Sequence, residues 1–83
     1  MSAVPELNIQ VARHLSVQAD KLERQGKNKF RIMAYRRAAQ SVRSLEKSLW
    51  GIYGSRGLKG LQAVKGIGNR IAWDIVKQIR NKS

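Results

Sequence analysis

The sequence contains no cysteine, a single histidine and only five acidic residues among its 83 positions. Without cysteine the chain can form no disulfide, no thiolate zinc site and no cysteine nucleophile. With His14 as the only histidine, a histidine-rich metal site is excluded as well. No apolar run approaches the roughly 18–20 residues that span a bilayer, and the first ten residues lack the basic and apolar regions of a secretory signal. We therefore expect an intracellular protein of the cytoplasm, nucleoid or nucleus that does not contact a membrane.

Positive charge is what the composition has in excess. Seventeen Lys and Arg against five Asp and Glu give a formal net charge of +12 and a pI near 11.3. Such an excess is self-repelling in the folded state, and a polyanionic partner relieves the repulsion. Nucleic acid is the commonest such partner, with DNA and RNA both open; a merely basic protein is the alternative. The length fits one domain over 1–83, and 42% hydrophobic residues are enough for a core.

Apolar residues recur at helical spacing along the chain, and no period-two run indicates a strand. Segment 7–25 predicts a first helix, with Asn8 as its N-cap and Gly26 as its stop. Segment 28–44 predicts a second helix and segment 45–53 a short third one, while two more helical segments flank a glycine-rich turn in the last third. The expected fold is all-α, a compact bundle of four to five helices that ends in a helix-hairpin-helix.

The second helix is expected to have an apolar face and an opposite basic one. Phe30 belongs to the apolar set, which covers about a third of the circumference, so we expect it to pack inward. A basic stripe on the opposite side comprises Lys29, Arg36 and Arg43. A solvated outer face is the ordinary interpretation of such a run, and contact with DNA phosphates is the functional one.

The two tryptophans carry separate expectations. Trp50 is expected to be a core or half-buried anchor, because a large aromatic ring seldom stays fully exposed. Trp73 lies beside the apolar stripe of the last helix, and not squarely on it. It is therefore expected either to form a half-buried rim or to contact a partner or a nucleobase.

Residues 58–79 read LKGLQAVKGIGNRIAWDIVKQI, the helix-hairpin-helix pattern, which we place at about 58–80. Two glycines allow a tight turn and close approach of the backbone to a ligand, and the isoleucine between them would join the two helices. The turn leads into a helix N-terminus, whose free N–H groups and dipole favour a phosphate. An ordinary glycine-closed helical turn is the alternative. The expected DNA-backbone site consists of Lys65, Gly66, Ile67, Gly68, Asn69 and Arg70.

Over nearly its whole length the chain resembles the N-terminal helical domain of the X family of DNA polymerases. The resemblance rests on Asn8, on Phe30-Arg31, on the run AYRRAA at 34–39 and on 61–75, all in family order. It implies a role in DNA repair, through binding of gapped or nicked DNA at the downstream 5′-phosphate. The resemblance places a 5′-phosphate pocket at Arg31, Tyr35 and Arg70. It also implies that K⁺ or Na⁺ bridges a phosphate to the backbone carbonyls of Gln62, Val64 and Ile67; no other cofactor is expected.

The chain departs from that family at positions that matter for chemistry. Phe30 and Gln62 stand where the resemblance expects a pocket histidine and lysine, and Asp74 stands at the lysine that forms a Schiff base in lyase members. A carboxylate cannot form an imine, so only Lys77 or Lys65 could substitute. The five acids show no clustered metal-binding pattern, so polymerase activity is not expected either.

The sequence therefore predicts a sequence-nonspecific DNA-binding module that is not an enzyme. Two alternatives stay open. One is a deoxyribose-phosphate lyase that uses a substitute lysine, and the other is a protein-docking helix-hairpin-helix domain with Trp73 as a contact.

Overall fold

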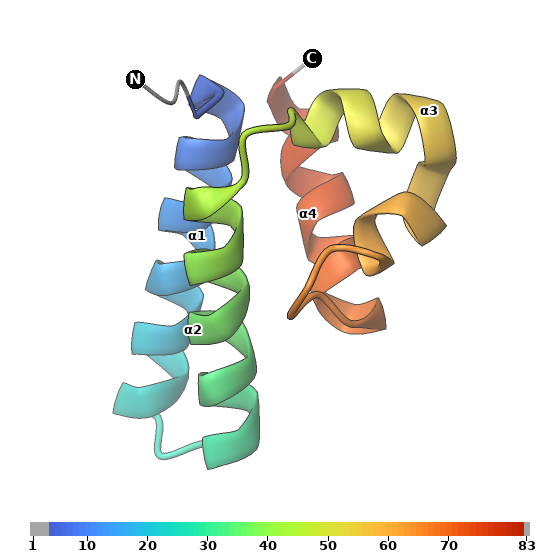
Figure 1. Ribbon diagram of the computed structural model, residues 1–83. Helices are drawn as coiled ribbons and strands as arrows, with labels where there is room; N and C mark the ends of the chain where they lie inside the picture. The colour runs from blue at the N-terminus through green and yellow to red at the C-terminus, as the bar shows by residue number, and fades with distance from the viewer. Residues whose placement is uncertain (1–3, 83) are drawn as a thin grey trace.

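The computed structural model describes residues 4–82, without the side chain of Lys82, and over that range it contains helices joined by turns and no strand. The first two helices run antiparallel, side by side, and the last helix lies between this pair and the third helix (Figure 1). The all-α prediction is confirmed, and the number of helices falls within the expected four to five. The four helices are α1 (Glu6–Arg24), α2 (Lys29–Ser44), α3 (Leu49–Gln62) and α4 (Asn69–Lys82). None of the helices described here is long and apolar enough to cross a membrane.

Glycine and asparagine set the turn between α1 and α2, as the sequence predicts. Gly26 has a φ of +67°, which is favourable only for glycine, and α1 ends just before it. Asn28 caps α2, since its side-chain oxygen accepts a hydrogen bond of 2.8 Å from the backbone N–H of Phe30.

Phe30 itself is 84% exposed, so the prediction that it packs inward is wrong. The buried residues of α2 are Tyr35, Ala38, Ala39 and Val42. At about 100° per residue, Phe30 lies well over a quarter of a turn away from the centre of that face.

Asn8 is not the N-cap of α1, because that helix begins at Glu6 and Asn8 lies inside it, fully buried. Its Nδ2 donates to the carbonyl oxygens of Leu45 and Lys47, at 3.2 and 2.8 Å. Its Oδ1 accepts a bond of 2.9 Å from the N–H of Leu49, the first residue of α3. Asn8 therefore caps a helix, as its type predicts, but the helix is α3 and the cap comes from α1.

α3 starts later and extends further than the predicted third helix over 45–53. Residues 45–48 form a non-helical connection that Asn8 holds in place, and Leu45 is in an extended conformation. The helix then continues to Gln62 through a bend at Gly57, where φ is +65° and ψ is −151°. Because these angles are not helical, Leu49–Gln62 consists of two helical segments that meet at a kink, so the separate segments expected on the two sides of this glycine are present.

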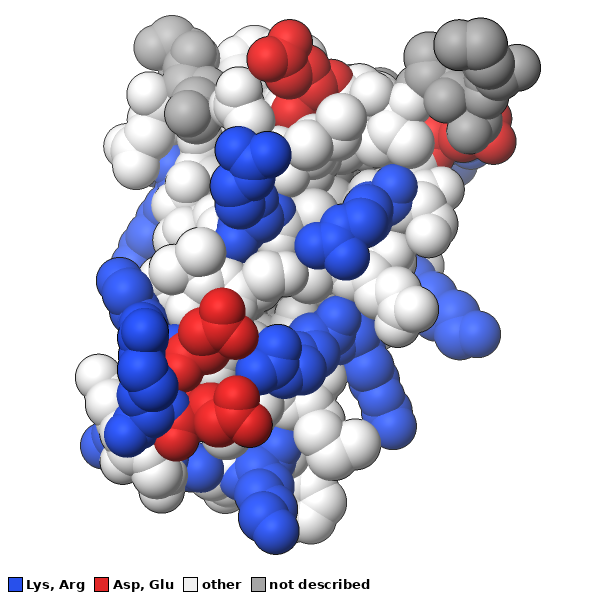
Figure 2. Space-filling model, turned by 90° about the vertical axis from the view of Figure 1, so that its left-hand side faces the viewer, with Lys and Arg blue, Asp and Glu red and all other residues white. Residues whose placement is uncertain are grey.

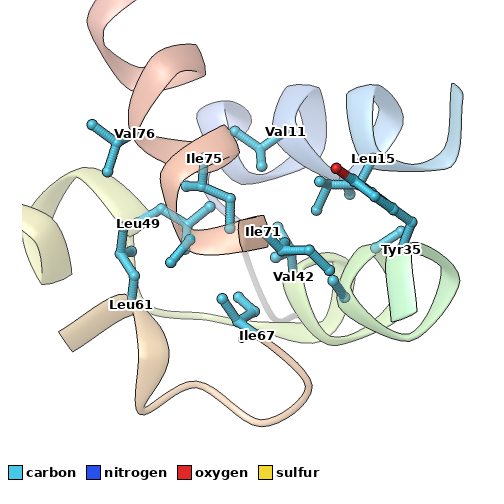
Figure 3. Packing of buried hydrophobic residues seen from close by; sticks show 14 of the residues in the cluster. Val11, Leu15, Tyr35, Val42, Leu49, Leu61, Ile67, Ile71, Ile75 and Val76 are labelled. Carbon is cyan, nitrogen blue, oxygen red and sulfur yellow. The ribbon is translucent and has the colours of Figure 1, made fainter. Parts of the chain in front are cut away.

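The core combines side chains from all four helices and the final turn. Figure 3 shows Ile71 and Ile75 of α4 among side chains of α1 and α2, with Leu49 and Leu61 of α3 beside them. Trp50 is 52% exposed and Trp73 is 50% exposed, so both side chains are exposed and neither belongs to the core. The prediction that Trp50 is a core or half-buried anchor is therefore wrong. α4 is thus fixed by its apolar face, and its first turn and opposite face remain free for other contacts.

Candidate nucleic-acid interface

The turn between α3 and α4 is a glycine-dependent hairpin, which docks on α2. Within it, the N–H of Ile67 donates to the carbonyl oxygen of Val64 at 3.1 Å. Gly66 has a φ of +84°, and a Cβ there would lie 3.2 Å from Oγ of Ser41 on α2. Glycine is therefore required at 66 by backbone conformation and by close packing together.

Ile67 anchors the hairpin, and the residues after it face outward. Its side chain is 4% exposed and joins the core next to Ile71 (Figure 3). Gly68, Asn69 and Arg70 are exposed, and Lys65 is exposed on the other side of the turn. The buried anchor thus presents the start of α4 to solvent in a fixed position.

The first turn of α4 has the properties of an anion site. Its N–H groups have no acceptor within the helix, and the helix dipole adds partial positive charge there. No acidic residue lies in this turn. The side chain of Asn69 accepts a hydrogen bond of 2.8 Å from Nε2 of Gln62, which braces the hairpin across its base. The backbone amides and the Arg70 guanidinium are therefore the groups available to a phosphate.

Two of the three residues assigned to the 5′-phosphate pocket line one cavity. Tyr35 and Arg70 border a space of about 410 Å³, together with Asn69, Trp73, Asp74 and Lys77. Arg31 is not among the lining residues, although its charge acts on Tyr35. Burial raises the pKa of the Tyr35 hydroxyl, the charge of Asp74 and a hydrogen bond to it raise that pKa further, and Arg31 opposes the rise.

Asp74 joins three helices, a role that the sequence analysis did not predict. Its Oδ1 lies 3.1 Å from Nε2 of His14 on α1, and its Oδ2 accepts a bond of 3.4 Å from the hydroxyl of Tyr35 on α2. The carboxylate is thus held by two partners on one side of the cavity. No sequence pattern indicates this contact, because His14 and Asp74 are 60 positions apart. Among the residues that the structure describes, no group of three or more His, Asp and Glu could hold a metal ion.

The basic stripe of α2 is partly neutralised. Nη2 of Arg36 lies 3.2 Å from Asp20 and 2.9 Å from Glu23, both on α1. Arg43 donates to Oγ of Ser16 at 3.4 Å, and Lys29 is exposed. The stripe has no acid nearby in sequence, but α1 brings two acids alongside it in space. Figure 2 shows this result: Lys and Arg cover much of the side formed by α1 and α2, with acidic side chains between them.

Gly68→Ala is expected to leave the fold intact and to weaken DNA binding about tenfold, which is ~1.4 kcal/mol. A methyl group at Gly68 would meet no heavy atom within 4 Å, and φ there is not positive, so folding does not require glycine. The same methyl group would keep a phosphate away from the first amides of α4. Fluorescence anisotropy with labelled duplex DNA measures the change. Gly54→Ala is the matched control, because Gly54 is equally open and far from the hairpin in sequence. Wild-type affinity of Gly68→Ala would remove the hairpin from the interface.

Comparison with known proteins agrees with this geometry. The family model described as "Helix-hairpin-helix domain" matches residues 6–83. No curated protein and no solved structure matches the chain. Domains of this kind are generally DNA-binding or protein-docking units. With a glycine turn, a buried isoleucine between two helices and a family match over nearly its whole length, the chain belongs to the helix-hairpin-helix domain family.

Proposed function

We propose that this protein binds the sugar-phosphate backbone of DNA through its hairpin, without reading the base sequence. The observation that carries the proposal is the uncovered first turn of α4, with Lys65 and Arg70 exposed beside it and no acid within it. Backbone amides and cations position a protein on phosphates but carry little sequence information. The net charge of +12 favours the same partner.

A finer proposal is that the protein prefers gaps or nicks with a 5′-phosphate. It is supported by the resemblance noted in the sequence and by the cavity where Arg70 and Tyr35 meet beside the hairpin. A terminal phosphate carries more charge than a phosphodiester, so a guanidinium gains more from it. Asp74 faces the same cavity, where its carboxylate is hydrogen-bonded to His14 and Tyr35, and its negative charge works against a bound phosphate. Trp73 also borders the cavity, where its half-exposed ring could stack on the terminal base.

The test is a titration of labelled gapped DNA carrying a 5′-phosphate, compared with gapped DNA ending in a 5′-hydroxyl, intact duplex and single strand. We expect the phosphorylated gap to bind most tightly, and Arg70→Ala to abolish that preference. Arg13→Ala, an exposed cation on α1, is the control for lost charge. Equal binding to all four substrates would reject the end preference while keeping backbone binding. Absence of binding to any of them would reject both, and protein docking would replace them.

We propose that the hairpin carbonyls of Gln62, Val64 and Ile67 hold the monovalent cation that the resemblance implies. Gln62 ends α3, Val64 lies in the turn and Ile67 precedes α4, so all three oxygens belong to the hairpin or its border. The carbonyl of Val64 accepts one hydrogen bond, from Ile67, and retains a second lone pair. Backbone carbonyls are suitable ligands for K⁺ and Na⁺. A bound ion would supply positive charge next to a phosphate, and this chain would hold it through main-chain atoms alone.

We also propose that the protein is not a lyase, and this can be tested by chemical trapping. The observation that favours the lyase alternative is Lys77, which borders the cavity beside Asp74; Lys65 does not border it. A lyase would condense the Lys77 amine with the aldehyde of an abasic site, releasing water and forming an imine. We expect borohydride to trap no covalent adduct on abasic DNA, with an active lyase as positive control. An adduct that forms with wild type and disappears in Lys77→Ala would establish the enzyme instead.

A further inference from the structure

A second, larger groove lies away from the Tyr35–Arg70 cavity and shares no lining residue with it. It measures about 870 Å³, within the roughly 300–1,000 Å³ of most ligand pockets. It is bordered by the C-terminal end of α2, the connection 45–48, α3 and the start of the hairpin. We call it the serine groove, because four serines line it: Ser41, Ser44, Ser48 and Ser55.

The serine groove has a cationic border. Lys47, Arg56 and Lys65 line it and are exposed, whereas Glu46 is its one acidic residue. Within the described part of the chain, none of these three cations is in an ion pair with a carboxylate. The surplus charge and the serine hydroxyls together favour an anionic ligand with several acceptor oxygens.

The groove also has an apolar floor. Leu45, Ile52 and Val64 line it, and each is only partly buried against the core. A ligand with flat apolar groups would cover these side chains, and phosphate groups alone would not. A single nucleic-acid strand combines both chemistries, since its bases are free to contact apolar side chains and its phosphates to contact cations. A duplex does not, because its bases are already stacked inside.

One wall of the groove lacks a side chain, because a glycine stands there. Gly51 lies on α3, exposed, and a Cβ there would meet nothing nearer than Cβ of Ser48 at 3.9 Å. Glycine within a helix costs about 1 kcal/mol relative to alanine, and packing within the chain does not require it here. Gly60 differs, because a Cβ there would come within 2.6 Å of Cβ of Arg56. The missing side chain at Gly51 therefore leaves space that a ligand can use.

We propose that the serine groove binds a single strand of nucleic acid that continues from the duplex held by the hairpin. This inference depends on the proposed function, because Lys65 belongs both to the hairpin and to the groove and connects the two. The protein would then hold duplex backbone at α4 and an unpaired strand between α2 and α3. Such an arrangement recognises a junction between double and single strand by its shape, without reading its sequence.

The first experiment compares blunt duplex DNA with the same duplex carrying a single-stranded tail of about ten nucleotides, within the range of ~4–16 that a small binding domain covers. We expect wild type to bind the tailed duplex at least tenfold more tightly, with the excess lost in Gly51→Leu, whose side chain fills the groove without changing charge. Gly54→Leu is the matched control, since Gly54 is exposed on the same helix but does not line the groove. Equal affinity of both variants for the tailed duplex would overturn the proposal.

A second pair of variants tests charge independently of shape. One double variant carries Lys47→Glu and Arg56→Glu in the groove. The control double variant carries Lys21→Glu and Arg24→Glu, at two exposed cations of α1, so the net charge of both variants changes equally. We expect only the groove pair to lose the preference for the tail, with equal binding of blunt duplex by both. Poly-glutamate and oligothymidylate of equal charge then serve as competitors for the groove. If the peptide competes as well as the oligonucleotide, a nucleic-acid occupant of the groove is rejected. If the hairpin proposal were wrong, wild type would not bind blunt duplex DNA, and this result distinguishes failure of the hairpin proposal from failure of the groove proposal.

Discussion

Asn8→Ala is expected to lower the free energy of unfolding by about 2–4 kcal/mol, because buried polar groups lose their partners. The amide of Asn8 makes three hydrogen bonds: two to carbonyl oxygens of residues 45 and 47, and one from the N–H of Leu49. Asn8 and Leu49 are both completely buried, so water cannot replace the bond between them, whereas the two bonds to the carbonyls of residues 45 and 47 are only partly buried. A chain of 83 residues has a stability near the low end of the usual ~5–15 kcal/mol, so the loss is a large part of the total.

Urea denaturation followed by circular dichroism measures the loss, and Gln40→Ala, an exposed residue of α2, is the control. Amide hydrogen exchange adds a local reading. The N–H of Leu49 should lose protection in Asn8→Ala by more than the global loss of stability accounts for, since its only acceptor there is Oδ1 of Asn8. A loss below about 0.5 kcal/mol, the range of ordinary surface substitutions, would contradict the capping role.

Local sequence pattern predicts those parts of this fold that depend on neighbours in the chain. The turn at Gly26, the hairpin at Gly66 and the apolar face of α4 all follow from spacing and from glycine chemistry. The same reasoning fails for Phe30, because the apolar positions of a short segment fix the centre of its buried face only loosely, and the buried face of α2 is centred on Tyr35 and Ala38, away from Phe30. That these segments form helices was therefore predictable, whereas the side that α2 buries was not.

The contacts that shape the candidate sites come from pairings far apart in sequence. Asn8 caps a helix 41 positions away, and Asp74 meets His14 across 60 positions. Arg36 appeared uncompensated because its two acidic partners belong to α1. The serine groove likewise combines residues of α2, α3 and the hairpin. Residue type indicated a capping role for Asn8 alone, and for all of these side chains only the three-dimensional arrangement identifies the partners.

The affinity for duplex DNA is expected to fall about a thousandfold or more between roughly 50 and 200 mM salt, if six to ten phosphates are contacted. Each cation that meets a phosphate releases a condensed counterion, so the logarithm of the affinity falls linearly with the logarithm of salt concentration. Anisotropy titrations at several salt concentrations give the slope, and therefore the number of phosphates. A flat response would contradict backbone binding altogether.

The structure also predicts which cations contribute to that slope. Arg70→Ala should reduce it by about 0.9, the value for one phosphate contact on B-form DNA, because Arg70 is exposed next to the free amides of α4. Arg36→Ala should reduce it by much less, since Arg36 already contacts Asp20 and Glu23 and would have to leave them to meet a phosphate. Both variants lose one positive charge, so a long-range effect of net charge would change the two slopes equally. A larger reduction in Arg70→Ala than in Arg36→Ala would therefore locate the DNA at the hairpin and away from the middle of α2, and the reverse order would contradict that location.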